Sequence, residues 1–134
     1  MSIVLGISCV FAVLAGLVHV YIFFLESVSW TSARTRQVFG IADEAEARAT
    51  RVLAFNQGFY NLFLAVGAVL GVILIVTGSP VTGWPLVVFT CACMVGAGVI
   101  LGASGRRYLN SAFVQGAFPL IALVFAFVGS FFVS

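Results

Sequence analysis

The sequence predicts an all-α fold, a polytopic membrane bundle of four helices in a single transmembrane domain over residues 1–134. Of the 134 residues, 63% are hydrophobic and only 7% are charged, and the mean hydropathy is +1.23. Soluble domains carry about 25% charged residues, so lipid must surround most of this chain. The composition excludes a secreted disulfide scaffold, a nucleic-acid binder and an ordinary cytosolic enzyme. In particular, six arginines without any lysine are too few to follow a phosphate backbone.

Four apolar stretches are long enough to cross a bilayer, which takes about 20 residues. We expect spans at residues 3–25, 52–76, 85–103 and 111–132. The first is a retained span, because it lacks the basic leader and the small-residue cleavage site of a signal peptide. The second ends where Gly78 and Pro80 stop a helix. The third is expected to open at Pro85, which a first helical turn tolerates.

All the arginines lie in two connections, between the first two spans and between the last two. They are Arg34, Arg36, Arg48 and Arg51 in the first connection, and Arg106 and Arg107 in the second. The termini and the middle connection carry no charged side chain. The positive-inside rule therefore predicts that both Arg-bearing loops are cytoplasmic and that the N-terminus and C-terminus lie outside. The expected location is the cytoplasmic (inner) membrane, in multi-pass form.

The connection over residues 31–51 is the one sizeable soluble part, with a helix start near residue 43. Asp43 can cap this helix while Glu46 takes the third position, which is a capping-box arrangement. No helix breaker separates this start from the second span. A continuous helix from about Glu44 to Val76 would be roughly 50 Å long, so its first turns should project into the cytoplasm.

Small residues recur four apart within the spans. Gly67 and Gly71 form one GxxxG pair, and Gly98 and Gly102 form another. Because small residues let helix backbones approach in lipid, these pairs predict packing surfaces. The sequence leaves open whether they pack within one bundle or between subunits.

The few polar side chains within the spans gather in the cytoplasmic half of the membrane. On the first span, His19, Phe23 and Glu26 share one helical face. The second and fourth spans add Asn56, Gln57, Tyr60, Asn61 and Gln115 at comparable depth. Ionisable side chains inside a membrane indicate a functional site by default. These eight residues predict a cytoplasm-facing polar pocket that binds a ligand.

Two structural interpretations compete with this pocket. Glu26 can pair with an arginine of the first connection at the membrane surface. His19 can be satisfied by Asn61 or Tyr60, as a hydrogen bond that holds two helices together.

Two motifs carry a resemblance to a known family. The first is HVYIFFLE, from His19 to Glu26, and the second is NQGFYNLFLAVG, from Asn56 to Gly67. With these motifs, the chain resembles the small bacterial membrane proteins grouped as domain-of-unknown-function family 1304 over nearly its whole length. The resemblance implies a four-span bundle with a shared polar motif. It implies no established activity.

The residues favour a protein that binds or transports a small amphipathic molecule or lipid in the pocket. One alternative is an accessory or structural subunit of a larger membrane complex, and a homo-oligomer is also conceivable. Another is a membrane isomerase in which His19 transfers protons and Glu26 acts through water or substrate. No cofactor or metal is predicted, because His19 has no second haem ligand in the sequence. The expected partners are the bilayer and a lipid or amphipathic ligand, without nucleic acid.

Overall fold

The computed structural model describes residues 2–131, which contain helices and no β-strand. Its four long helices are α1 (Ile3–Phe23), α3 (Glu44–Val76), α4 (Pro80–Ala103) and α5 (Leu109–Ser130). The shorter elements are the π-helical turn η1 (Phe24–Val28), the helix α2 (Ala33–Phe39) and the 3-10 turn η2 (Arg106–Tyr108). The four long helices, two of them extended by these turns, are long and apolar enough to cross a membrane. The predicted all-helical, four-span fold is confirmed.

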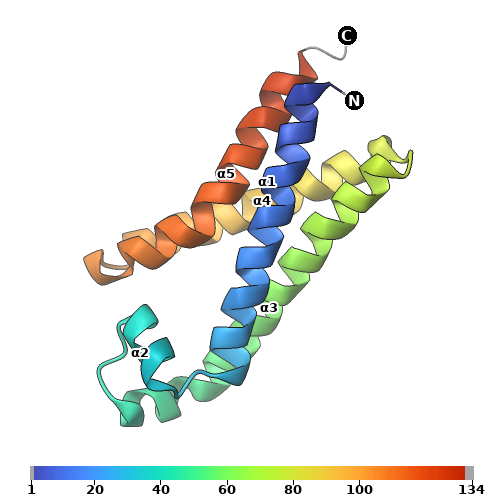
Figure 1. Cartoon of the computed structure of the whole chain (residues 1–134). Helices are drawn as coiled ribbons and strands as arrows, with labels where there is room; N and C mark the ends of the chain where they lie inside the picture. Colours follow the sequence, from blue (N-terminus) through green and yellow to red (C-terminus); the bar gives the residue numbers. More distant parts are fainter. Residues whose placement is uncertain (1, 132–134) are drawn as a thin grey trace.

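The long helices form a closed ring of neighbours. α1 packs against α3 and α5, and α4 packs against the same two helices. In Figure 1, both chain termini lie at one end of the molecule, and α2 lies at the other end beside the start of α3. We call this second end the arginine end, because α2, the start of α3 and η2 carry all six arginines.

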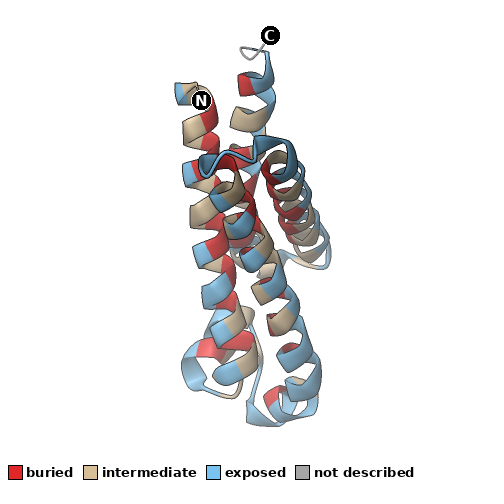
Figure 2. Cartoon of the chain, turned by 90° about the vertical axis from the view of Figure 1, so that its right-hand side faces the viewer, coloured by how far each residue is buried: buried red, intermediate tan, exposed pale blue. Residues whose placement is uncertain are grey.

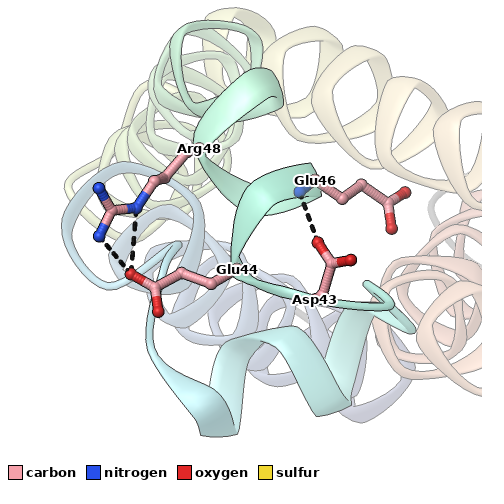
Figure 3. A network of polar contacts seen from close by, with 4 residues as sticks. All are labelled: Asp43, Glu44, Glu46 and Arg48. Carbon is pink, nitrogen blue, oxygen red and sulfur yellow. Dashed lines mark hydrogen bonds and ion pairs between the residues drawn. The ribbon is translucent and has the colours of Figure 1, made fainter.

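α3 starts at the position that the sequence predicts, with Asp43 as its cap, while Glu46 bonds the residue before the cap. Asp43 is the N-cap, and its Oδ1 accepts a hydrogen bond from the Glu46 N–H at 2.8 Å. Glu46 Oε2 in turn accepts from the Ala42 N–H at 2.8 Å. One turn later, Arg48 forms an ion pair with Glu44 at 2.5 Å (Figure 3). α3 then continues for 33 residues without a break, which is roughly 50 Å at 1.5 Å per residue.

The start of the third span differs from the prediction. α4 begins at Pro80, which takes the first helical position, and Pro85 lies in the second turn. Both Pro80 and Pro85 are compatible with the first turn of a helix. Packing against α3 therefore determines that the helix starts at Pro80. The added turn brings Gly83 against α3, where a Cβ on Gly83 would lie only 2.5 Å from the Gly71 carbonyl oxygen.

The first connection contains a helix that the sequence analysis did not expect. α2 is capped by Ser32, whose Oγ accepts from the Thr35 N–H at 3.2 Å. It ends at Gly40, which has a φ of 66°, a left-handed conformation that favours glycine. Thr35 is fully buried. Its hydroxyl is bonded within the same connection, to Ser29 and Ser32.

Small residues form most of the buried face of α3. The buried positions are Ala47, Ala54, Gly58, Asn61, Ala65, Ala68, Gly71 and Ile75. Figure 2 shows buried residues following stripes along the helices, with exposed residues on their other faces. Gly67 of α3 faces Thr90 of α4, and Gly98 of α4 faces Ala112 of α5. The predicted glycine surfaces thus pack within one chain, which answers the question that the sequence left open.

Candidate functional site

Glu26 is buried at the arginine end and is held by an amide. Its side chain is only 8% exposed, and its Oε2 accepts a hydrogen bond from Asn61 Nδ2 at 2.8 Å. The same Nδ2 also donates to the Gln57 carbonyl oxygen at 3.2 Å. Among residues 2–131, the only ion pair is that between Arg48 and Glu44. The interpretation that Glu26 pairs with a loop arginine is therefore wrong for this structure.

A π-helical turn places Glu26 against α3. Within η1, the Ser29 N–H reaches the Phe24 carbonyl oxygen, five residues back, at 3.1 Å. Opposite this turn lies Gly58, where a Cβ would meet Ser27 Oγ at 2.1 Å. Ser27 Oγ donates to the Phe55 carbonyl oxygen at 2.9 Å, which ties the two helices together. Single π-turns within α-helices are common at functional sites.

His19 is buried with one ring nitrogen unpartnered. Its Nδ1 lies 2.9 Å from the Ala15 carbonyl oxygen. Because that oxygen can only accept, Nδ1 carries the proton, and Nε2 presents a lone pair in neutral histidine. Nε2 is buried without a hydrogen-bond partner among the described residues. The expectation that Asn61 or Tyr60 satisfies His19 is therefore wrong, since Asn61 is bonded to Glu26 and Tyr60 is 55% exposed.

The helix register places two of the predicted residues, His19 and Gln115, one turn from the same apolar cluster of the bundle. Ala15, Ala68 and Met94 form an apolar core cluster, against which Leu64 and Phe118 pack. One turn closer to the arginine end, α1, α4 and α5 contribute the buried residues His19, Gly98 and Gln115. Asn61 of α3 lies two turns from Ala68, at the level of Glu26, to which it is bonded. Gly98 lets α5 approach α4 closely, because a Cβ at that position would lie 3.2 Å from the Ala112 carbonyl oxygen.

The remaining predicted residues lie apart from His19 and Gln115. Asn56, Gln57 and Tyr60 are exposed on the outer side of α3. Phe23 is half-buried and packs edge-on against Phe59, with ring centroids 5.1 Å apart. The eight predicted residues therefore do not line a single pocket between the spans.

A cleft of about 310 Å³ lies at the arginine end between α1, α2 and α5. Its lining residues are Tyr21, Ile22, Leu25, Gln37, Val38, Phe39, Asn110, Ser111, Val114 and Gln115. Gln115 is the one residue of the predicted site that lines it. Sequence reasoning missed the wall formed by α2, although a residue type that caps helices, Ser32, and one that ends them, Gly40, flank it.

Hydrogen bonds and ring contacts hold α2 as a wall of this cleft. Ser111 Oγ of α5 donates to the Val38 carbonyl oxygen at 3.2 Å. Trp30 packs against Phe39, with ring centroids 5.2 Å apart, and its Nε1 donates to Thr50 Oγ1 at 3.2 Å. The cleft is therefore bounded by elements that lie far apart in the sequence.

A second, larger cleft of about 940 Å³ lies at the opposite end, between α1, α4 and α5. Its lining is Leu5, Pro80, Val81, Trp84, Val88, Leu123, Ala126, Phe127 and Ser130. A binding site normally combines an apolar surface with a few polar groups that orient the ligand. Apart from the Ser130 hydroxyl and the Trp84 N–H, this lining has no polar side chain. The smaller cleft at the arginine end is therefore the better candidate site.

Comparison with known proteins supports the family that the two motifs indicate. The family described as "Protein of unknown function (DUF1304)" matches residues 13–127, which include most of α1 and α5 and all of α2, α3 and α4. No curated protein and no solved structure matches the chain.

Proposed function

We propose a function from the site itself, because the chain belongs to the DUF1304 family, whose description names no activity. The chain is an integral membrane protein. Its cleft at the arginine end holds a small amphipathic molecule or a lipid. The polar group of the ligand lies against the amides and the hydroxyl of the cleft, and its apolar body lies against Ile22, Leu25 and Val114.

The lack of hydrogen-bond partners for the amides in the cleft is the main support for this proposal. Gln37, Asn110 and Gln115 all line the cleft, and none of the three side chains makes a hydrogen bond within residues 2–131. Gln115 is the most telling of them, since it is buried within a membrane span. Its amide is open to the cleft, because it is not among the fully buried side-chain groups without a partner in residues 2–131. An amide without a partner is costly in apolar surroundings. A bound polar group would remove this cost.

Filling the cleft should abolish binding. Val114 lines the cleft and is 53% exposed, so a tryptophan there can occupy the cleft without disturbing the core. We expect Val114→Trp to lower the amount of lipid that remains bound after mild extraction by about tenfold, equivalent to about 1.4 kcal/mol of binding free energy. Native mass spectrometry measures the bound lipid for each chain.

Val124→Trp is the matched control, because Val124 lies on the same helix, is 51% exposed and lines neither cleft. It should retain lipid at the level of the unmodified chain. Equal retention by both tryptophan variants would show that the cleft is not the binding site.

The proposal includes the predicted orientation, with the arginine end in the cytoplasm. In a chain with Cys9, Cys91 and Cys93 replaced by alanine, a single cysteine can be placed at Asp43 or at Ser79. A membrane-impermeant maleimide should label Ser79→Cys in intact cells and Asp43→Cys only after permeabilisation. The reverse pattern would place the cleft in the opposite leaflet.

A second candidate role, as a subunit of a homo-oligomer or larger complex, is favoured by one observation. Asn56 and Gln57 direct amides away from the bundle on the exposed side of α3. Polar side chains on the outside of membrane helices often bind a neighbouring helix. Proton transfer by His19 has less support, since His19 lines neither cleft.

A further inference from the structure

We infer that the ligand of this cleft carries an anionic phosphate group, bound between Arg34 and Arg107. This inference rests on the proposed function and adds the chemical class of the headgroup. The phosphate lies at the mouth of the cleft, the amides Gln37 and Asn110 contact the adjoining polar atoms, and the apolar body points toward Val114.

Arg34 reaches the cleft from the first turn of α2. Its Nη2 lies 3.5 Å from the hydroxyl of Tyr21, to which it donates. Tyr21 belongs to the lining on α1. The guanidinium of Arg34 is thus held beside the cleft, and its other N–H groups are free to contact an anion, because this is the one hydrogen bond of the side chain within residues 2–131.

Arg107 of η2 lies beside the end of α2, next to the cleft. Its Cδ would lie 3.8 Å from a Cβ at Gly40, the residue that follows the lining residue Phe39. The guanidinium stacks on the ring of Tyr108, 4.6 Å from the centroid, and donates to the Tyr108 hydroxyl. Stacking orients the group while leaving N–H donors for a ligand.

No acidic side chain neutralises either arginine in the part of the chain that the structure describes. Asp43, Glu44 and Glu46 all lie at the start of α3, where they cap the helix or pair with Arg48. Glu26 is buried against Asn61. Two uncompensated guanidinium groups, one beside Tyr21 and one whose side chain passes Gly40, create a positive potential over the cleft.

Phosphate suits this arrangement better than a neutral headgroup. Guanidinium groups form short, charge-assisted hydrogen bonds with phosphate oxygens and can bind them in a bidentate manner. Basic pockets between membrane helices at the cytoplasmic side are a recognised way to bind anionic lipids. A membrane phospholipid and a soluble phosphate compound both carry such a phosphate group. The two differ in the length of their apolar part.

Binding titrations on the full chain in non-ionic detergent test the inference. The probes are dihexanoyl phosphatidic acid, inorganic phosphate and hexyl glucoside, which supplies a neutral headgroup. We expect phosphatidic acid to bind at least about tenfold more tightly than the glucoside. The double variant Arg34→Gln/Arg107→Gln should bind phosphatidic acid about tenfold to thirtyfold more weakly than the unmodified chain.

Arg51→Gln/Arg106→Gln is the matched control. It removes the same two charges from the same end, but neither residue has a contact with the cleft lining like that of Arg34 with Tyr21, or with the residue next to it like that of Arg107 with Gly40. Its affinity for phosphatidic acid should stay within about threefold of the unmodified value. A soluble phosphate compound is indicated if inorganic phosphate binds as tightly as phosphatidic acid, and a membrane lipid is indicated if it binds more weakly. Both results support an anionic phosphate ligand.

The inference is overturned if phosphatidic acid and the glucoside bind equally and Arg34→Gln/Arg107→Gln leaves both affinities unchanged. If Val114→Trp still abolishes binding in that case, the proposed function stands without the phosphate. If none of the probes binds, the proposed function and the inference both fail.

Discussion

Gly83→Ala is expected to push α4 away from α3 and to lower the free energy of unfolding by about 1–3 kcal/mol, the usual cost of overpacking. A Cβ at this position would lie 2.5 Å from the Gly71 carbonyl oxygen and 2.9 Å from the Ile75 amide nitrogen. Both atoms belong to the backbone of α3, so no side-chain rotation relieves the contact. The expected destabilisation can be measured by titrating the chain from mild detergent into a denaturing detergent while following its helicity.

Gly96→Ala provides the matched control on the same helix. No atom lies within 4 Å of a Cβ at Gly96. Alanine favours a helix over glycine by up to about 1 kcal/mol, so this variant should be as stable as the unmodified chain or slightly more stable. Equal destabilisation by both alanines would mean that the close contact of α3 and α4 is absent.

Asn61→Leu is expected to have the second large effect, because it leaves the buried carboxyl of Glu26 without its hydrogen-bond donor. Orphaning a buried polar group costs about 1–3 kcal/mol, and hydrogen bonds between membrane helices have averaged about 0.6 kcal/mol in one well-studied bundle. Since Glu26 is only 8% exposed, we expect Asn61→Leu to lower the free energy of unfolding by about 1–3 kcal/mol rather than by the smaller average. The same detergent titration measures it.

A double-mutant cycle isolates the contact between these two side chains. Glu26→Leu combined with Asn61→Leu removes both partners, so the pair should be less destabilised than the sum of the single variants by at least about 0.5 kcal/mol. Asn56→Leu, on the exposed side of the same helix, should change stability by less than about 0.5 kcal/mol. Additive losses in the cycle would rule out the hydrogen bond between Asn61 and Glu26.

The parts of the fold that depend on local signals could be predicted from the sequence. Hydropathy locates four spans, and Asp43 with Glu46 marks the start of α3 at the residue where the structure has it. α2 could not be located in this way. Seven residues form a weak helix on their own, and α2 depends on the buried Thr35 and on the contact between Trp30 and Phe39.

The candidate site could be predicted only in part, because a sequence gives the angle of a side chain on its helix but not the neighbour that it meets. Tyr60 and Asn61 are adjacent in the chain, yet one is 55% exposed and the other is bonded to Glu26. The polar residues predicted on the second span spread over more of the helix surface than α1 covers. As a result, Asn56, Gln57 and Tyr60 face outward.

Gln115 was found by sequence reasoning because a lone amide in an apolar span is conspicuous. Its neighbours in the cleft were not, since Tyr21, Val38 and Phe39 are ordinary residues for a membrane surface. They form a site only when α2 folds back against α5 through the hydrogen bond from Ser111 to Val38. Such a wall depends on tertiary structure that no local pattern encodes.

The claim that the cleft at the arginine end is the binding site can be tested most directly by photo-crosslinking. A short-chain phosphatidic acid that bears a diazirine on its acyl chain would be irradiated with the full chain in detergent, and the labelled peptides would be mapped by mass spectrometry. We predict adducts within residues 21–25, 37–39 and 110–115, which line this cleft. Adducts confined to residues 80–88 and 123–130, around the larger apolar cleft, would contradict the assignment.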